Sequence, residues 1–224
     1  MCIRDRSFDD VTSAARLDRV LLVMGANFGD LDNDGHPDLY LGTGAPDYRT
    51  LMPNRMFRNN GSGAFQDVTT AGGFGHLQKG HGIAFADVDA DGDQDVYAVM
   101  GGWYTGDVFP NVLFENPGHG NHWITLRLRG TRANRSAIGA RIKVTVRVPS
   151  GSRQIHALAG TGGSFGSASL QQEIGLGKAE AIEEIEIWWP GQEGRQVFRG
   201  PEMDRAYLAE EGATMLQPVR GGDS

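Results

Sequence analysis

Aspartate occurs at alternate positions in two short segments of the sequence, each with the pattern D-x-D-x-D-G-x-x-D. The aspartates at positions 1, 3, 5 and 9 of this pattern are Asp30, Asp32, Asp34, Asp38, Asp87, Asp89, Asp91 and Asp95. A divalent cation of the size of calcium binds about six to eight oxygen ligands, which carboxylates and main-chain carbonyls supply. The carbonyl at position 7 belongs to His36 in the first loop and to Asp93 in the second. The spacing therefore predicts about two Ca²⁺ sites.

Two other interpretations compete with a calcium loop. An EF-hand would need a bidentate Glu at position 12, which is Leu41 in one copy and Ala98 in the other. A solvated acidic turn is the other interpretation, since Asp and Gly are ordinary turn residues. Four carboxylates within nine residues would repel one another without a cation, and the pattern occurs twice. Calcium is therefore the favoured interpretation.

The two loops belong to an internal repeat with an offset of 57 residues. Three landmarks recur in this register: residues 8–12 as 65–69, 28–40 as 85–97, and 53–59 as 110–116. Because three separate landmarks share one offset, we interpret residues 7–120 as two copies of one structural unit. Residues 1–6 precede the frame and are expected to be a junction or truncation scar.

Each repeat contains short runs that alternate apolar and polar residues, such as residues 38–41 and 64–68, separated by glycine or proline. This pattern is typical of short antiparallel strands, and a unit of this length with about four strands has the size of a propeller blade. Two blades cannot close a ring. We therefore expect the remaining blades of the propeller to lie upstream, outside this sequence.

The repeat frame ends near residue 121. A third Phe-x-Asp-Val-Thr motif would begin at position 122, which is His122 instead. Strict alternation of apolar and polar residues follows, for example along residues 142–148 and 185–189. Residues 121–211 are therefore expected to form an antiparallel β-sandwich-like domain, and residues 212–224 a flexible tail. The predicted fold class is all-β.

The loops and their flanking strands resemble the FG-GAP/VCBS repeat of integrin-alpha-type propellers. This resemblance implies that the aspartates of both loops bind structural calcium and that the complete ring has about seven blades. Residues 121–123, 130–141, 160–165, 174–177 and 187–191 resemble the ASPIC/UnbV domain. That domain follows FG-GAP-like repeats in secreted proteins similar to cartilage acidic protein and in bacterial homologues, so the chain is expected to be the C-terminal part of such a protein.

Charge and composition limit the possible partners. Residues 1–120 contain 17 acidic and 8 basic residues, which argues against nucleic acid. No apolar run reaches the roughly 20 residues of a membrane-spanning helix. Eight basic residues within 121–160, with no acid among them, could form a polyanion-binding face or could be neutralised by cross-strand ion pairs. Ion pairing is the favoured interpretation.

An enzymatic function is not predicted. Residues 162–166 satisfy G-x-S-x-G, but no histidine follows His156 and no helical pattern follows Gly166, so a glycine-rich loop is expected instead of a nucleophile elbow. Trp188 lies on the polar side of its predicted strand, and Trp103 lies in a glycine-rich loop. Such aromatic residues could stack on sugars or lie at an interface with other blades.

These observations favour a non-enzymatic, calcium-binding recognition or scaffold protein that is extracellular, at the cell surface or periplasmic. Its partner is expected to be an unidentified protein or glycan. The alternative is an accessory carbohydrate-binding or regulatory part of a longer secreted enzyme.

Overall fold

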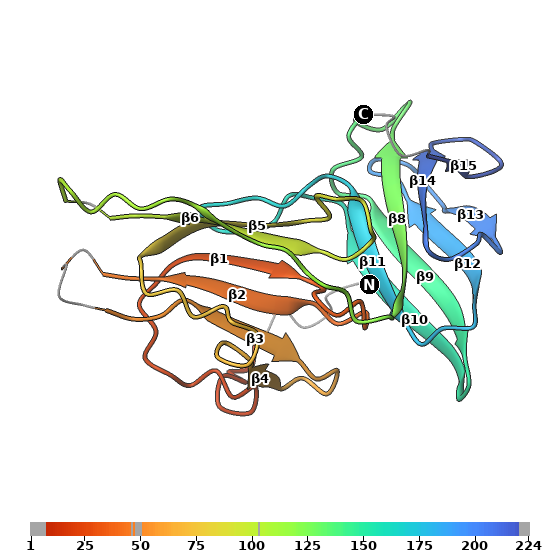
Figure 1. Ribbon diagram of the computed structural model, residues 1–224. Helices are drawn as coiled ribbons and strands as arrows, with labels where there is room; N and C mark the ends of the chain where they lie inside the picture. Colours follow the sequence, from red (N-terminus) through yellow and green to blue (C-terminus); the bar gives the residue numbers. More distant parts are fainter. Residues whose placement is uncertain (1–7, 46, 48–50, 103, 220–224) are drawn as a thin grey trace.

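The computed structural model describes residues 8–45, 47, 51–102 and 104–219 of the 224-residue chain. The predicted junction at residues 1–6, Trp103 and the end of the predicted tail lie outside these described residues. The described residues form strands, turns and loops without a helix, so the all-β prediction is confirmed. With no helix among them, none is available to cross a membrane. Strands β1–β7 form one group and strands β8–β15 a second (Figure 1).

The first repeat forms a four-stranded antiparallel sheet in chain order. Its strands are β1 (Val23–Gly29), β2 (Asp38–Thr43), β3 (Arg55–Asn59) and β4 (Phe65–Asp67). The second repeat forms a three-stranded sheet from β5 (Gly80–Ala86), β6 (Asp95–Met100) and β7 (Val112–Phe114). The strands β5, β6 and β7 begin 57 residues after β1, β2 and β3, respectively. The two sheets are therefore two copies of one blade, as the repeat predicted.

The two blades pack face to face through their apolar side chains. Tyr40 and Met56 of the first blade are completely buried in one cluster with Ile83, Phe85 and Val96 of the second. This burial arises because alternate residues of a strand point to the same face of its sheet. The shared core fixes the two aspartate loops at the same end of the pair of blades.

The remaining strands form two further four-stranded sheets around one core. The first has the order β10-β9-β12-β13, from β10 (Gly151–Leu158), β9 (Arg141–Val148), β12 (Ala181–Trp188) and β13 (Gln196–Arg199). The second has the order β11-β8-β14-β15, from β11 (Gln172–Gly177), β8 (His122–Arg129), β14 (Arg205–Glu210) and β15 (Gln217–Pro218). Apolar side chains from both sheets fill a common core, as in a sandwich.

Two details of this domain differ from the expectations. Strand β14 pairs with β8 in parallel, so the expected antiparallel sandwich-like domain contains one parallel pair. Alternation shows which face of a strand is buried but carries no information on strand direction. In addition, Gln217 and Pro218 pair with β14, so this part of the predicted flexible tail belongs to a sheet.

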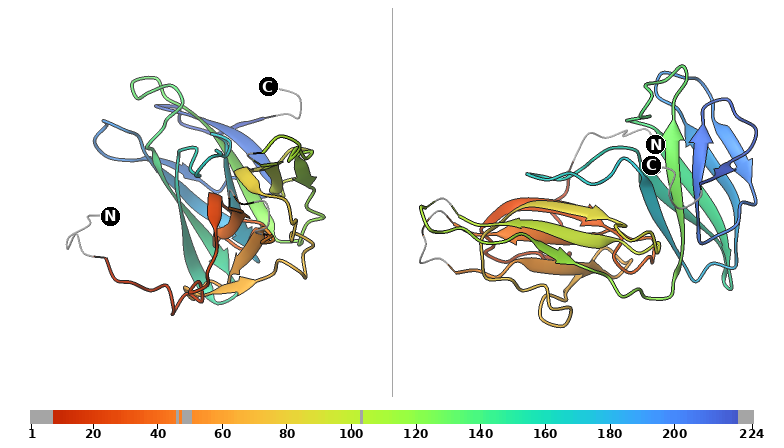
Figure 2. Two further views of the ribbon diagram at one scale, coloured as in Figure 1. Left: turned by 90° about the vertical axis from the view of Figure 1, so that its left-hand side faces the viewer. Right: turned by 45° about the horizontal axis from the view of Figure 1, so that its top comes forward.

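A long loop of the sandwich extends back over the blades. Residues 159–171, between β10 and β11, run alongside the blades in all views (Figures 1 and 2). Ser164 pairs with Ala26 of β1 in an isolated antiparallel bridge, and Gly166 lies against Ile83 of β5. The loop thus holds the sandwich domain to both blades.

Candidate metal centre

The first aspartate loop connects the paired strands β1 and β2 through a tight turn. Asn33 and Gly35 adopt left-handed backbone conformations, with φ of 52° and 84°. The carboxylate of Asp30 accepts hydrogen bonds from the main-chain N–H groups of Asp34 (3.0 Å) and Gly35 (2.8 Å). The N–H of His36 donates to the Asp34 carboxylate at 2.8 Å. These bonds fold the loop so that its first carboxylate lies at its centre.

The second loop repeats this geometry. The carboxylate of Asp87 accepts hydrogen bonds from the main-chain N–H groups of Asp91 (3.1 Å) and Gly92 (3.0 Å). The main-chain N–H of Asp93 donates to the Asp91 carboxylate at 2.9 Å. Ala90 and Gly92 have φ of 64° and 95°. A left-handed conformation is unusual for Ala, which has no side-chain group to stabilise it. The fold therefore imposes one loop conformation on two different sequences.

The aspartate at position 9 joins each loop to its blade. Asp38, the first residue of β2, accepts hydrogen bonds from the N–H groups of Leu31 (2.9 Å) and Asn59 (2.7 Å). Asp95, the first residue of β6, accepts the equivalent bonds 57 residues later, at 3.0 and 2.8 Å. Each of these carboxylates therefore ties the loop to the chain at or just after the end of the third strand of its blade.

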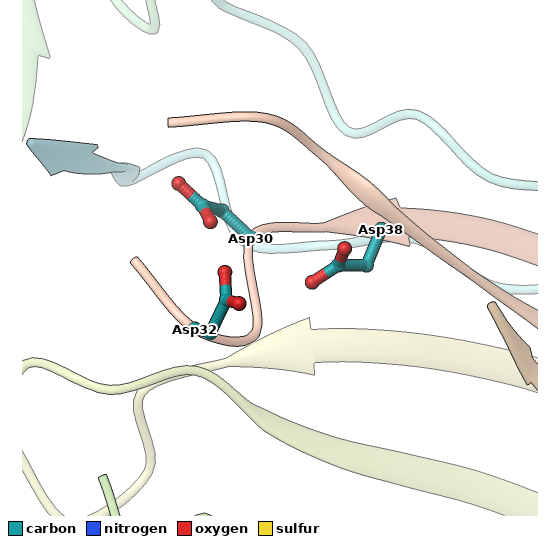
Figure 3. Close-up of side chains that lie close together, drawn as sticks. All are labelled: Asp30, Asp32 and Asp38. Atoms are coloured by element: carbon teal, nitrogen blue, oxygen red, sulfur yellow. The ribbon is translucent and has the colours of Figure 1, made fainter. Parts of the chain in front are cut away.

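The structure brings three of the predicted side-chain ligands together in each loop. One oxygen from each carboxylate lies within 4.8 Å of the others in the sets Asp30, Asp32 and Asp38 (Figure 3) and Asp87, Asp89 and Asp91. Asp34 and Asp95, also predicted as ligands, fall outside these two sets. His36 and Asp93 were predicted to offer their main-chain carbonyls. In the structure, the side chain of His36 accepts a hydrogen bond from Arg153 at its Nε2 atom (3.1 Å), and the carboxylate of Asp93 accepts one from Asn33 (2.8 Å).

The first loop is an electrostatically unfavourable place for carboxylates on their own. Burial raises the pKa of Asp30 to about 7 and that of Asp38 to about 8, because the charged form loses its hydration. Burial and the neighbouring Asp34 also raise the pKa of Asp32. The Oδ1 atom of Asp32 is buried and has no hydrogen-bond partner among the described residues. A bound cation would satisfy this oxygen and neutralise the repulsion.

The chemistry of the donor set fits a hard cation. The converging ligands of both loops are all carboxylate oxygens, which calcium and magnesium prefer, whereas zinc sites use mainly nitrogen and sulfur. The two sites differ in exposure: the three carboxylates of the first loop are buried, whereas Asp89 and Asp91 of the second are exposed. The first loop therefore gains more from neutralisation of its charge.

The sandwich domain holds the main chain of the first loop, which the sequence did not reveal. Asn121 donates to the carbonyl of Asp32 at 2.7 Å, and Arg153 donates to the carbonyl of Asp34 at 2.6 Å. Between them, the carbonyl of Asn33 accepts a hydrogen bond from the N–H of Gly177 at 2.8 Å. Three successive carbonyls of the loop are thus bound by residues from the other domain.

Glycines permit this close approach of the two domains. A β-carbon on Gly175 of β11 would lie 2.2 Å from an Asp30 carboxylate oxygen, and one on Gly92 would lie 1.9 Å from the ring of Trp123. The Ile174–Gly177 segment, I-G-L-G, is the only local signal in the sequence for the first contact. The spacing of residues along the chain predicts neither contact, because the contacting residues are far apart in sequence.

The two loops are also bridged to each other. Gln94 accepts from the N–H of Asp30 (2.7 Å) and donates to the carboxylate of Glu173 on β11 (2.7 Å). Glu173 also accepts from the N–H of Asp87 at 3.3 Å, and its burial raises its pKa. Asn33 donates to the carbonyl of Gly92 at 3.0 Å. Both loops and strand β11 therefore form one hydrogen-bonded unit.

The other residues singled out in the sequence have structural roles. Ser164 of the G-x-S-x-G segment exchanges main-chain hydrogen bonds with Ala26, and no helix follows it in the described chain. The ring of Trp188 is half-buried, with the Arg141 guanidinium 5.6 Å and the Lys143 ammonium 6.0 Å from its centroid. The ring of Trp188 therefore already has two cations as neighbours.

Ion pairs account for much of the basic charge in residues 121–160. Arg129 pairs with Glu210, Lys143 with Glu186, and Arg147 with Glu180. The ion-pairing interpretation is favoured over a polyanion-binding face, although the partners come from several strands that the sequence did not pair.

The fold and the loops define a class of protein: an all-β repeat protein with propeller-type blades, aspartate loops and a C-terminal sandwich. The family model described as FG-GAP-like repeat matches residues 30–98, and the model described as ASPIC and UnbV matches residues 130–215. These two matches agree in order and position with the resemblance described from the sequence. No curated protein matches the chain.

Proposed function

We propose that the chain is a calcium-binding, non-enzymatic scaffold or recognition module that acts outside the cytosol. The observation that carries this proposal is the convergence of three buried carboxylates in the first loop, one of which has an unpartnered oxygen. FG-GAP-like repeats and the ASPIC and UnbV region support an extracellular type of protein. Extracellular calcium modules bind at about 10⁻⁴ to 10⁻³ M, a range suited to calcium-rich surroundings.

Calcium would be held by the carboxylates that converge in each loop, with Asp34 and Asp95 and the carbonyls of His36 and Asp93 as the further predicted ligands. When bound, the ion supplies positive charge that offsets the repulsion between the carboxylates. The chain's own residues do the rest. Asp38 and Asp95 tie each loop to the chain near the end of the third strand, and the sandwich domain binds carbonyls of the first loop. The proposed role of calcium is therefore to stabilise the blades and their junction with the sandwich.

Such a module needs no catalytic group, and its extended β surfaces suit recognition of a protein or glycan. The sugar-binding alternative would require an open aromatic face, and Trp188 has two cations against its ring. We therefore propose that the module recognises its protein or glycan partner through surfaces other than the ring of Trp188.

Calorimetric titration with CaCl₂ tests the calcium proposal. The parent chain should bind about two ions. Asp32→Asn should weaken binding in the first loop and Asp89→Asn in the second, because each substitution removes one negative charge and keeps a single neutral oxygen ligand. The double variant should bind more weakly at both sites, by about tenfold or more. Asp9→Asn, which alters an exposed aspartate outside both loops, is the matched control. Undiminished binding in the double variant would falsify the ligand assignment.

A further inference from the structure

A groove of about 560 Å³ lies on the sandwich domain. Its lining residues come from β8, the β8–β9 loop, the end of the loop before β11, and β14, and none of them belongs to a blade. They include three arginines and three leucines: Arg127, Arg129, Arg135, Leu128, Leu170 and Leu208. The sandwich domain therefore builds this groove from its own residues.

The strand register places two of the arginines on the outer face of the sheet. Strand β8 lies between β11 and β14 (Figure 1). Because Leu126 belongs to the core, its neighbour Arg127 points to the opposite face, and so does Arg129. On this face, Leu208 of β14 lies opposite Arg127, and Glu210 lies opposite Arg129. The middle strand of the sheet thus carries the two guanidinium groups into the groove.

Neighbouring side chains hold these two arginines in place. The Nε atom of Arg127 donates to the side-chain oxygen of Gln171 at 2.7 Å, and Arg129 pairs with Glu210. Gln171 is itself held, because its Nε2 atom donates to the Glu173 carboxylate at 3.2 Å. These bonds restrict the guanidinium groups before a ligand binds, which lowers the entropic cost of binding.

The third arginine, Arg135, approaches the groove from the β8–β9 loop. Its side chain is exposed and forms an ion pair with none of the described carboxylates. The loop is well held, since the N–H of Gly130 donates to the Arg135 carbonyl at 3.0 Å and Glu211 binds the N–H groups of residues 131–133. No acidic residue lines the groove, and Glu210 alone is paired with one of its arginines. The groove therefore keeps a positive charge.

The leucines add an aliphatic part to this basic groove. Leu128, Leu170 and Leu208 line it, and Leu170 is 37 % exposed. Arginine pairs best with carboxylates and similar planar anions, whereas exposed leucine gains most from contact with another apolar group. A sulfated glycan offers anions but no aliphatic side chains. An acidic peptide that also contains aliphatic residues offers both.

We propose that this groove binds an acidic, leucine-containing segment of a partner protein. Its carboxylates pair with Arg127 and Arg135, and its aliphatic side chains pack against the three leucines. This inference names the class of partner for the recognition role proposed above and rests on that role. It does not rest on calcium, because no aspartate of either loop lines the groove.

The test uses the full chain and a fluorescent peptide of sequence EDLDLE. Fluorescence polarisation should show saturable binding of one peptide per chain, and added NaCl should weaken it because salt screens exposed charges. The peptides QNLNLQ, without the charges, and EDSDSE, without the leucines, should each bind at least tenfold more weakly. Arg135→Gln should weaken binding of EDLDLE at least fivefold. Arg199→Gln, at an exposed arginine of the other sheet, is the matched control and should change nothing.

Absence of saturable binding, or binding that Arg135→Gln leaves unchanged, would overturn the inference. Equal affinity for EDSDSE would do the same, because the leucines would then contribute nothing. A heparin fragment that binds more tightly than EDLDLE and is lost in Arg135→Gln would assign the groove to a sulfated glycan instead. Calcium titration of the same samples separates the two proposals. A chain that binds calcium but no peptide refutes this inference alone, and one that binds the peptide but no calcium refutes only the calcium proposal.

Discussion

Asp32 has a buried carboxylate oxygen to which no described group donates a hydrogen bond. The nearest cation is the Arg58 guanidinium, at 3.7 Å from the other oxygen, and its side chain is about half exposed. A surface contact of this kind contributes little. The carboxylates that share the loop with Asp32 raise its energy further, since like charges repel. Asp32 therefore destabilises the fold unless a cation is bound.

Asp32→Asn should consequently change stability in opposite directions with and without calcium. In the presence of a chelator, the variant should be more stable than the parent by about 1 kcal/mol, because a charge that burial and the neighbouring Asp34 carboxylate destabilise is removed. In excess calcium it should be less stable, because the parent alone gains the full binding energy. Urea unfolding in both buffers measures this. Asp9→Asn should shift neither value, and a destabilised variant in chelator would contradict the argument.

At the scale of single elements, strand β11 contacts the first loop together with Asn121 and with Arg153 of β10. Its close approach depends on Gly175, since a β-carbon there would meet Asp30 at 2.2 Å and the main chain of Asn33 at 2.4 Å. Backbone atoms cannot move aside as the end of a flexible side chain can. The backbone of the loop or of the strand must therefore move if this glycine is replaced.

Gly175→Ala should lower the melting temperature by several degrees and weaken calcium binding at the first loop, because the strand would push Asp30 away from the other ligands. Gly160→Ala is the matched control, since a β-carbon at Gly160 would meet nothing within 4 Å. Calorimetry and thermal unfolding of both variants provide the measurement. Equal effects of the two substitutions would show that the contact is unimportant.

The loop between β8 and β9 is held by a single carboxylate. Glu211 accepts hydrogen bonds from the N–H groups of Thr131 (2.8 Å), Arg132 (2.7 Å) and Ala133 (2.8 Å). Burial alone would raise the pKa of Glu211, but these donors and the Arg132 charge lower it to about 2. This loop belongs to the segment that resembles the ASPIC/UnbV domain. It therefore depends on an ionised residue directly after β14.

Glu211→Gln should lower the free energy of unfolding by about 2 kcal/mol at pH 7. Because the folded pKa lies below the unfolded value, the contribution of Glu211 is complete above the unfolded pKa and disappears as the pH falls toward 2. The difference between variant and parent should therefore shrink between about pH 5 and pH 2. Denaturant unfolding over this range measures it. A difference that does not vary with pH would contradict the role of the charge.

At the scale of the whole molecule, the sequence predicts the blades and the sandwich better than it predicts the contacts between them. The 57-residue offset predicts both blades and their loops, because a repeat preserves each local pattern. The parallel pairing of β14 with β8 was missed, since strand direction leaves no trace in alternation. The contacts of Arg153 and Gly175 with the first loop were missed for a similar reason. They join residues more than 100 positions apart, and only folding of the whole chain brings these residues together.

These contacts make the aspartate loops the junction between the two parts of the molecule. The sandwich binds the carbonyls of the first loop through Asn121, Arg153 and Gly177. It can do so only while the loop keeps its turn. If calcium orders the loops, as proposed, then calcium also stabilises the attachment of the sandwich to the blades.

Removal of calcium should therefore loosen β11 from the blades. Hydrogen exchange of the Gly177 amide, which is bonded to Asn33, should become about tenfold faster or more in chelator. Exchange in β13, which pairs with β12 on the other sheet, should change little. Arg153→Ala should accelerate exchange at Gly177 even with calcium bound. Arg147→Ala, at an exposed arginine paired with Glu180, should leave it unchanged. If chelation instead accelerated exchange equally in β11 and β13, calcium would stabilise the molecule as a whole and the loops would not be its junction.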